Sequence, residues 1–545
     1  MRGLMQDRPL LISSLIRHAA EYHTHAGVCS IDSDGALQRW TYPELHARAA
    51  QLAHALVRLG VKPGDRIATL AWNDNRHFET YFAVSGIGAV CHTINPRLFS
   101  EQISYIVRHA EDRWLFVDAG LLAAVEGVIA DISGTIEGIV VLGEVPADSG
   151  LAAHTKLVAY EKLIAPEPAT FDWPEFDETT ASSLCYTSGT TGNPKGVLYS
   201  HRSTVLHAWS IALPDVIGLR AIDVVLPIVP MFHVNAWGIP YAAAMTGASL
   251  AMPGSRLDGP SLHKLIGEAG VTYAAGVPTV WLALLQHLRE TGGSLPEGLR
   301  GLVGGSALPQ ALVEAYDKEF GIRLEHGWGM TEMSPVGSYN SVKPENKDMS
   351  RTDYYVHANK QGRPPFGVDM KIINEAGEPV PHDGETSGEL CVRGPWITSG
   401  YYNSDEGAEQ FIDGGWFRTG DVATIDQSGY LHIVDRVKDL IKSGGEWISS
   451  IELENLALGV AGVREAAAIP AKHEKWGERP VLVIVKDPDG ELDETGVREH
   501  LAAHLSSWMM PDAVVFVDAL PHTATGKVLK RQLRDEYSDY LVGRG

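Results

Sequence analysis

The chain of 545 residues is too long for a single hydrophobic core, so it predicts several packed units. Its formal net charge of -23 argues against a nucleic-acid surface, which needs a basic stripe, although a few local donors can still hold a nucleotide. The four scattered cysteines form no CxxC pair and indicate neither disulfides nor zinc, which is typical of a cytoplasmic protein.

The N-terminal apolar stretch is short. Residues 10–16 run directly into Arg17 and His18 without the small-residue cleavage site of a signal peptide. We therefore expect an amphipathic segment of the mature protein.

Residues from about 60 to 310 alternate between two kinds of sequence pattern. Short Val/Ile/Leu/Ala runs, such as residues 66–71 and 138–142, alternate with helix-like segments such as residues 44–59. This alternation predicts α/β layers with largely parallel sheets.

Residues 186–196 contain three glycines, four hydroxyl side chains of Ser and Thr, and one lysine, Lys195. Glycines let backbone N–H groups approach an anion closely, hydroxyls add donors and lysine adds a mobile charge, so the run predicts a phosphate-binding loop joining two strands. The glycine spacing differs from that of a Walker P-loop, which ends in Gly-Lys-Ser/Thr. The alternative is a flexible polar loop.

Residues 224–255 contain no Asp, Glu, Lys or Arg and are long enough to span a bilayer. Four prolines interrupt them, so we expect a buried strand, a loop and a small-residue helix, and no integral membrane segment. Residues 365–434 change to short runs separated by Gly, Asp and Pro, which predicts a β-rich lobe.

The charged pentapeptide 435–439 precedes a last segment that looks like a small α+β domain. Pattern alone favours a solvated surface turn for the pentapeptide, because charge clusters usually lie in water. The alternative is a hinge at residues 435–440 between an N-terminal adenylation domain, 1–434, and a mobile C-terminal domain, 441–545.

The phosphate loop resembles the signature loop of the adenylate-forming superfamily, which includes acyl-CoA synthetases, amino-acid adenylation domains and firefly-type luciferases. Further motifs of that superfamily follow in its order: Gly327-Trp328-Gly329-Met330-Thr331-Glu332, Trp416-Phe417-Arg418-Thr419-Gly420-Asp421, residues 435–439, Ser443-Gly444-Gly445-Glu446-Trp447 and Pro521-His522-Thr523-Ala524-Thr525-Gly526-Lys527. Over nearly its whole length the chain looks most like the bacterial medium- and long-chain fatty acyl-CoA synthetases, a branch that also contains 3-methylmercaptopropionate-CoA ligases.

The resemblance assigns roles to individual residues, with ATP, Mg²⁺ and coenzyme A as the implied cofactors. Thr331 would contact the α-phosphate and Glu332 would hold Mg²⁺, while Asp421 and Arg436 would bind the ribose hydroxyls. The phosphate cradle would consist of Thr187, Ser188, Gly189, Thr190, Thr191, Gly192 and Lys195, and the adenine enclosure of Gly305, Ser306, Ala307, Gly327, Trp328 and Gly329. Without the resemblance, Trp328 would be interpreted as a core residue, and the Thr331-Glu332 pair as the start of a helix.

The resemblance also implies two half-reactions on one site. Lys527 would bridge the acid and the nucleotide during adenylation, and a swing about Lys438 would then bring Lys442 and Gly444 to the path of coenzyme A. Without the resemblance, Lys527 would be interpreted as a solvated surface lysine. A homodimer through the N-terminal domain is a further expectation.

The acid pocket is expected at His233, Trp237, Gly276 and Val277, which fall in largely apolar stretches; His233 would also be catalytic and Trp237 would gate a fatty-acid tunnel. Amino-acid-activating relatives usually place an aspartate near His233, and its absence favours a plain carboxylic acid. The alternative is that these residues simply belong to the hydrophobic core.

We therefore expect an acid:CoA ligase for medium- to long-chain fatty acids, with 3-methylmercaptopropionate or another short acid as the alternative. Two other classes stay open. They are an adenylating enzyme that loads a carrier protein, or a luciferase-like oxidase, and a non-catalytic nucleotide-binding scaffold.

Overall fold

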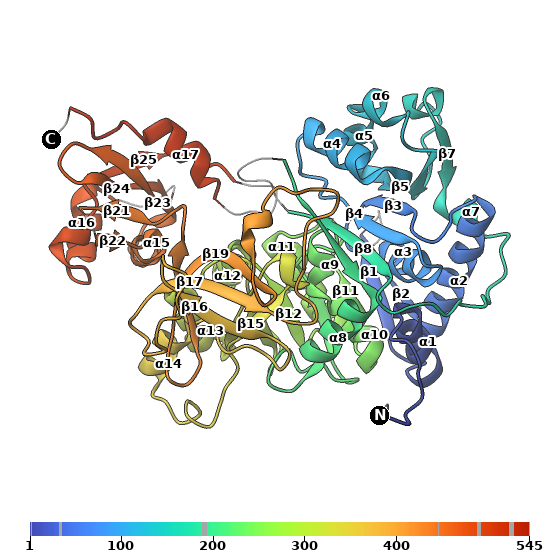
Figure 1. The fold of residues 1–545 in the computed structure, drawn as a ribbon, viewed down its shortest axis with the longest axis horizontal. Helices are drawn as coiled ribbons and strands as arrows, with labels where there is room; N and C mark the ends of the chain where they lie inside the picture. The colour runs from blue at the N-terminus through green and yellow to red at the C-terminus, as the bar shows by residue number, and fades with distance from the viewer. Residues whose placement is uncertain are drawn as a thin grey trace.

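The computed structural model describes residues 1, 3–31, 35–187, 193–444, 446–487, 492–522 and 528–543. It has an α/β N-terminal domain with a β-rich lobe and a smaller C-terminal domain, as expected (Figure 1). No described helix is both long and apolar enough to cross a membrane.

Two largely parallel sheets form the body of the N-terminal domain. The first has the strand order β7 (Lys156–Ala159), β6 (Gly138–Leu142), β5 (Asp112–Asp118), β3 (Arg66–Leu70), β4 (Val90–Thr93), β8 (Ala181–Tyr186) and β9 (Gly196–Ser200). The second has the order β15 (Val336–Tyr339), β14 (Leu324–Gly329), β13 (Arg300–Val303), β12 (Tyr273–Gly276), β10 (Val224–Pro227), β11 (Ser249–Met252), β1 (Gly27–Ile31) and β2 (Leu37–Thr41).

Helices cover both faces of these sheets, because parallel strands that are apolar on both faces must be buried on both. The helices between the sheets share one core with them: α1 (Ile12–Tyr22), α2 (Tyr42–Arg58), α3 (Asn75–Gly86), α8 (His201–Ala212) and α10 (Ile239–Thr246). The first sheet is covered outside by α4 (Ser100–Ala110), α5 (Leu122–Glu126) and α6 (Ile129–Ile132). The second is covered by α11 (Gly259–Ala269), α12 (Pro278–Thr291), α13 (Gln310–Phe320) and α14 (Arg351–Ala358).

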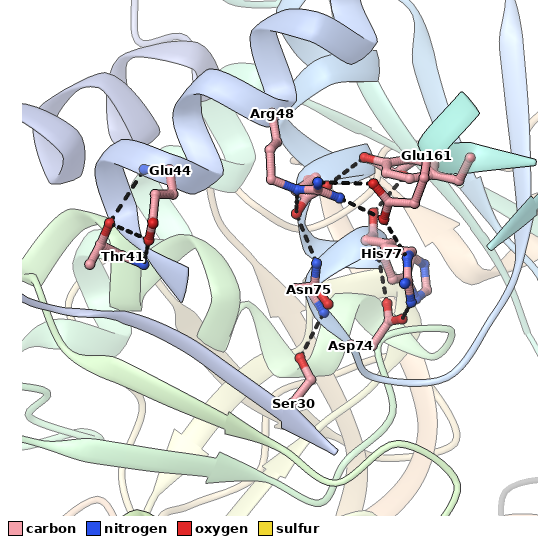
Figure 2. Close-up of polar contacts among 12 residues, drawn as sticks. Ser30, Thr41, Glu44, Arg48, Asp74, Asn75, His77 and Glu161 are labelled. Carbon is pink, nitrogen blue, oxygen red and sulfur yellow. Dashed lines mark hydrogen bonds and ion pairs between the residues drawn. The ribbon is translucent and has the colours of Figure 1, made fainter. Parts of the chain in front are cut away.

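Local sequence signals explain the helices of the N-terminal region. Thr41 and Glu44 form a capping box at the start of α2, and Asp74 accepts the His77 N–H at the start of α3 (Figure 2). The guanidinium of Arg48 on α2 makes a two-pronged contact with Glu161 of α7 (Tyr160–Ile164), so ionic contacts join helices that are distant in sequence (Figure 2).

Residues 224–255 fold as the sequence predicts. They form β10, a loop, α9 (Val234–Trp237), α10 and β11, all within the body of the N-terminal domain. The apolar composition therefore reflects burial between two sheets.

The β-rich lobe is an antiparallel sheet of β16 (Asp369–Ile373), β17 (Gly388–Arg393), β18 (Phe411–Ile412), β19 (Trp416–Ile425) and β20 (Leu431–Arg436). The C-terminal domain lies beyond this lobe, at the opposite end of the molecule from β3, β4 and β5 (Figure 1). Its sheet contains β21 (Ile441–Ser443), β22 (Glu446–Ile448), β23 (Val463–His473), β24 (Gly477–Lys486) and β25 (Ala513–Val517), with α15 (Ser450–Leu458) and α16 (Glu494–Ala502) on one face and α17 (Lys530–Tyr537) on the other.

The pentapeptide 435–439 is not a simple solvated turn. Asp435 is the last residue but one of β20 and is only 1% exposed. Its Oδ2 accepts hydrogen bonds from the N–H and the hydroxyl of Ser450, each over 2.6 Å, and burial raises the pKa of its carboxyl. The surface-turn interpretation is therefore wrong for Asp435, because the start of α15 replaces its water.

Candidate active site

The two ends of the phosphate loop are held together between the antiparallel strands β8 and β9. The Thr187 N–H donates to the Lys195 carbonyl over 2.9 Å, and the Lys195 N–H donates to the Thr187 hydroxyl over 3.1 Å. The strand–loop–strand prediction is therefore confirmed, whereas Ser188, Gly189, Thr190, Thr191 and Gly192 lie outside the described residues.

Lys195 lies close to the predicted Mg²⁺ ligand, and the residue between them is Tyr401. The Lys195 ammonium is 4.4 Å from the centroid of the Tyr401 ring, and the Tyr401 hydroxyl donates to Glu332 Oε1 over 2.8 Å. Burial and the nearby Glu332 charge raise the pKa of Tyr401, so its hydroxyl is a neutral donor at physiological pH.

Thr331 and Glu332 belong to a short 3-10 turn, η3 (Thr331–Met333), which is separated from β14 by Met330 alone. Both residues are buried, and the Tyr199 hydroxyl of β9 donates to the Thr331 carbonyl over 2.6 Å. The turn that would carry the α-phosphate and metal contacts is thus fixed to the strand that follows the phosphate loop.

Glu332 fits a magnesium ion that takes most of its ligands from elsewhere. Within the described ranges no group of three or more His, Cys, Asp or Glu side chains could hold a metal ion. Mg²⁺ commonly binds one or two carboxylates and completes its shell with phosphate oxygens and water. The donor set of one fixed carboxylate therefore suits an ion that arrives with a nucleotide.

The predicted ribose and adenine residues are joined directly. The Trp328 Nε1–H donates to Asp421 Oδ2 over 3.0 Å, and Arg436 Nε is 2.6 Å from Asp421 Oδ1. Asp421 and Arg436 are also neighbours across the pairing of β19 with β20. The ring nitrogen of Trp328 thus supplies a donor to the Asp421 carboxylate.

Gly329 and Gly337 are required by the packing of this segment. A Cβ on Gly329 would lie 2.0 Å from the Pro335 carbonyl oxygen, and one on Gly337 would lie 2.4 Å from the Trp328 ring. Gly327 packs less tightly, since a Cβ there would be 3.1 Å from Leu302. The absence of a side chain at Gly329 and Gly337 therefore allows the Trp328 segment to pack closely against its neighbours.

The predicted nucleotide and acid regions share a wall at the end of β13, where Gly305, Ser306 and Ala307 follow the strand. A Cβ on Gly304 would be 2.8 Å from the Trp237 ring, and one on Gly305 would be 3.2 Å from Val277 Cγ1. The Gly304 N–H donates to the Gly276 carbonyl over 3.3 Å. The structure thus brings together Trp237, Gly276 and Val277 with Gly305.

His233 precedes the turn that carries Trp237. It is half-buried, and its N–H donates to the Pro230 carbonyl over 3.1 Å. The predicted pocket residues His233 and Trp237 thus come from one short segment, and the shared wall from two adjacent strands, β12 and β13.

The C-terminal residues are not brought into this cluster. Lys442 is exposed on β21, with its ammonium 4.5 Å from the centroid of the Trp447 ring, and the Gly444 N–H donates to the Trp476 carbonyl over 2.8 Å. Lys438 follows β20 in the connection to the C-terminal domain. Lys527 lies outside the described residues.

Two residues that lie beside the predicted site residues were not themselves predicted from the sequence. Tyr401 lies 69 positions after Glu332, outside every recognisable motif, and nothing local marks it as a partner of that carboxylate. Asn235 lies inside the apolar stretch 231–237, to which only a pocket role was assigned through His233 and Trp237. A buried amide in an apolar segment is a signal that could have identified Asn235, because such a group needs hydrogen-bond partners.

The comparison with known proteins decides the family. The family model "AMP-binding enzyme" matches residues 16–402, and the model "AMP-binding enzyme C-terminal domain" matches residues 452–527. The chain belongs to the AMP-binding enzymes.

Full-length relatives of this AMP-binding enzyme are CoA ligases. It is 50% identical over 543 residues to a 3-methylmercaptopropionyl-CoA ligase of Ruegeria lacuscaerulensis, with 100% of both chains covered. It is 48% identical over 544 residues to a medium-chain-fatty-acid–CoA ligase of Ectopseudomonas oleovorans, covering 99% of this chain and 98% of the relative. A crystal structure of an anthranilate CoA ligase in complex with anthranoyl-AMP matches with a TM-score of 0.86 at 26% identity, covering 98% of this chain and 99% of that one.

Proposed function

We propose that this AMP-binding enzyme is an ATP-dependent acid:CoA ligase that forms acyl-CoA, AMP and pyrophosphate through an acyl-adenylate. The observation that carries the proposal is the wall shared by the two regions: Trp237 and Val277 of the acid pocket pack against Gly304 and Gly305 of the adenine enclosure. A carboxylate held on one side of this wall would lie beside a nucleotide held on the other. The names of its full-length relatives support the same chemistry.

Adenylation joins a carboxylate to an anionic α-phosphate, so the site must neutralise charge and align the reactants. In the proposed arrangement Lys195 and the phosphate loop hold the phosphates, and the Thr331 hydroxyl orients the α-phosphate. Asp421 and Arg436 hold the ribose, with Trp328 fixing Asp421. When bound at Glu332, Mg²⁺ would reduce the negative charge of the phosphates.

The second half-reaction needs a different set of cations. We propose that Lys527 acts in adenylation, and that the C-terminal domain, residues 441–545, then turns about residues 435–440 to bring Lys442 and Gly444 toward the thiol path. The exposure of Lys442 supports this division, because the side chain has room to enter another surface. His233 would line the path between the acid and the thiol.

Medium- to long-chain fatty acids are the substrates that we propose first. The apolar surroundings of Trp237 and the medium-chain relative at 48% identity support them. The relative named as a 3-methylmercaptopropionyl-CoA ligase is 50% identical, which supports that short thioether acid as the second candidate. Loading of a carrier protein is the distant alternative.

We further propose that the enzyme is a cytoplasmic homodimer. The four described cysteines are all free and buried, which supports a reducing compartment. Light scattering that gives a monomer mass would reject the dimer.

A competition assay tests the substrate class. Purified protein is given ATP, Mg²⁺, coenzyme A and a mixture of acids from 3-methylmercaptopropionate to palmitate, and the thioesters are identified by mass spectrometry. Preference for the longer acids would support a fatty-acid ligase, and preference for the thioether acid would support the second candidate. Acyl-AMP without any thioester would refute coenzyme A as the acceptor.

A further inference from the structure

The turn that joins His233 to Trp237 has an unusual backbone. Val234, Asn235, Ala236 and Trp237 have φ angles of 47°, 51°, 49° and 57°, and Gly238 follows at 74°. L-residues avoid this left-handed region because the Cβ approaches the following carbonyl oxygen, and they enter it as single residues far more often than as a run. The segment α9 is thus a left-handed turn made almost wholly of residues that disfavour it.

Strain of this kind persists only where neighbouring contacts hold it, and it gathers at functional sites. Asn235 is the one amide side chain among residues 234–237, and it is only 4% exposed. Its Nδ2 donates to the Ser183 hydroxyl over 2.9 Å, and its Oδ1 is 3.5 Å from the Cys185 thiol, which donates to it. Both partners belong to β8, the strand that enters the phosphate loop.

Short-range hydrogen bonds close the backbone of the turn, and the backbone of Val234 and Asn235 also interacts with the Cys185 side chain. The Ala236 N–H donates to the carbonyls of Pro230 and His233 over 3.2 Å each, and the Gly238 N–H donates to the Asn235 carbonyl over 3.0 Å. These bonds close the turn upon itself, whereas the Asn235 side chain ties it to β8. Asparagine also tolerates the left-handed region better than valine, alanine or tryptophan.

The position of the turn sets where the two predicted pocket residues, His233 and Trp237, lie. The Trp237 ring at its end packs against Gly304 and Gly305, and His233 precedes its first residue. If the turn relaxed to right-handed backbone angles, the indole would leave this wall. The ring position therefore depends on the contacts that hold residues 234–237.

We propose that Asn235 is a positioning residue for acid selection. Its two hydrogen bonds to β8 hold the left-handed turn that presents His233 and Trp237 to the acid. This inference rests on the proposed ligase function, because it assigns a determinant of which acid the same site accepts.

The test compares side-chain loss with backbone change in the full-length enzyme. Asn235→Ala removes the amide and adds strain, Asn235→Gly removes the amide but keeps the left-handed region accessible, and Ser183→Ala removes one partner only. The matched control is Asn340→Ala, because Asn340 is another buried amide, bonded to the His357 and Lys360 carbonyls. AMP release is measured with straight-chain acids from butyrate to palmitate, and KM is determined separately for acid and ATP.

We expect Asn235→Ala to raise KM for the preferred acid about tenfold and to flatten the chain-length profile, as for loss of a group that aligns a substrate. KM for ATP should stay within about twofold, because the nucleotide contacts are unchanged. Asn235→Gly and Ser183→Ala should shift the profile in the same direction by smaller amounts, and the control should leave it unchanged.

Two results would overturn the inference. In one, the Asn235 variants keep the wild-type chain-length profile. In the other, they raise KM for the acid and KM for ATP by the same factor, which is the result expected if the substitutions only loosened the fold. If Asn235→Ala does not fold, Ser183→Ala decides between the same outcomes. A wild-type enzyme that releases no AMP with any acid would instead refute the ligase function itself.

Discussion

The Trp328 indole donates to Asp421 over 3.0 Å, and the other oxygen of that carboxylate lies 2.6 Å from Arg436. A carboxylate held from both sides cannot rotate freely, so it presents fixed acceptors where a ribose would bind. Trp328 therefore has two separable properties, a flat face and a donor.

Trp328→Phe separates these properties, because phenylalanine keeps an aromatic face and loses the N–H. We expect KM for ATP to rise about tenfold, the order expected for losing a hydrogen bond to a charged group. Conversion of supplied acyl-AMP to thioester should change much less in kcat. Steady-state kinetics of both reactions check this, and an unchanged KM for ATP would show that Asp421 is fixed by Arg436 alone.

Tyr401→Phe tests the contact between Tyr401 and Glu332. The ring remains for the Lys195 ammonium, but the donor to Glu332 Oε1 is lost. We expect the Mg²⁺ concentration for half-maximal adenylation to rise by about three- to tenfold, because the carboxylate is no longer oriented. Pyrophosphate exchange at a series of Mg²⁺ concentrations measures it. The matched control is Tyr402→Phe, and an equal shift in both variants would contradict the assignment.

Substitutions of Lys527 and Lys442 should impair opposite half-reactions. Lys527→Ala should depress adenylation by about 10²- to 10³-fold, as when one preorganised charge stabiliser is lost, and should leave thioester formation from supplied acyl-AMP intact. Lys442→Ala should show the reverse bias. Single-turnover assays of each half-reaction provide the measurement, and equal losses in both would refute the domain swing.

Buried His207 predicts an acid-sensitive stability. Its Nε2 accepts the Val336 N–H, and burial lowers its pKa to about 3. Because the unfolded pKa is higher, near 6.5, the unfolded state binds the proton first as the pH falls. The contribution of neutral His207 to the free energy of unfolding is therefore fully present above about pH 6.5. At pH 5 it is about 2 kcal/mol smaller.

The variant His207→Gln keeps an acceptor but cannot titrate. We expect it to be less stable at pH 7 and to lose less stability between pH 7 and pH 5 than the wild type does. Thermal unfolding midpoints at both pH values measure this. Exposed His382→Gln is the control, and a wild-type pH dependence in the His207 variant would contradict protonation of His207 as the cause.

The α/β body could be predicted from the sequence because buried parallel strands are short continuous apolar runs, as in β3 and β6. The strands around the phosphate loop were predictable for the same reason. The burial of Asp435 was not, since a charged pentapeptide is usually solvated and its partner, Ser450, follows only after the connection between the domains.

The candidate site was predicted by its motifs, but the contacts between motifs were not. Trp328 and Asp421 are 93 residues apart, and only the fold brings them together. The left-handed turn at residues 234–237 also has no warning in the sequence, because the only glycine is Gly238, which follows it. A backbone set by tertiary contacts leaves little trace in local propensity.

The most direct test of the ligase mechanism is a single turnover in two stages. Enzyme in excess over decanoate is mixed with ATP and Mg²⁺ without coenzyme A, and the products are identified before and after coenzyme A is added. We predict acyl-AMP and pyrophosphate in the first stage, and complete conversion to acyl-CoA and AMP in the second. Release of ADP and phosphate, or an acyl-AMP that coenzyme A does not discharge, would contradict the proposed function.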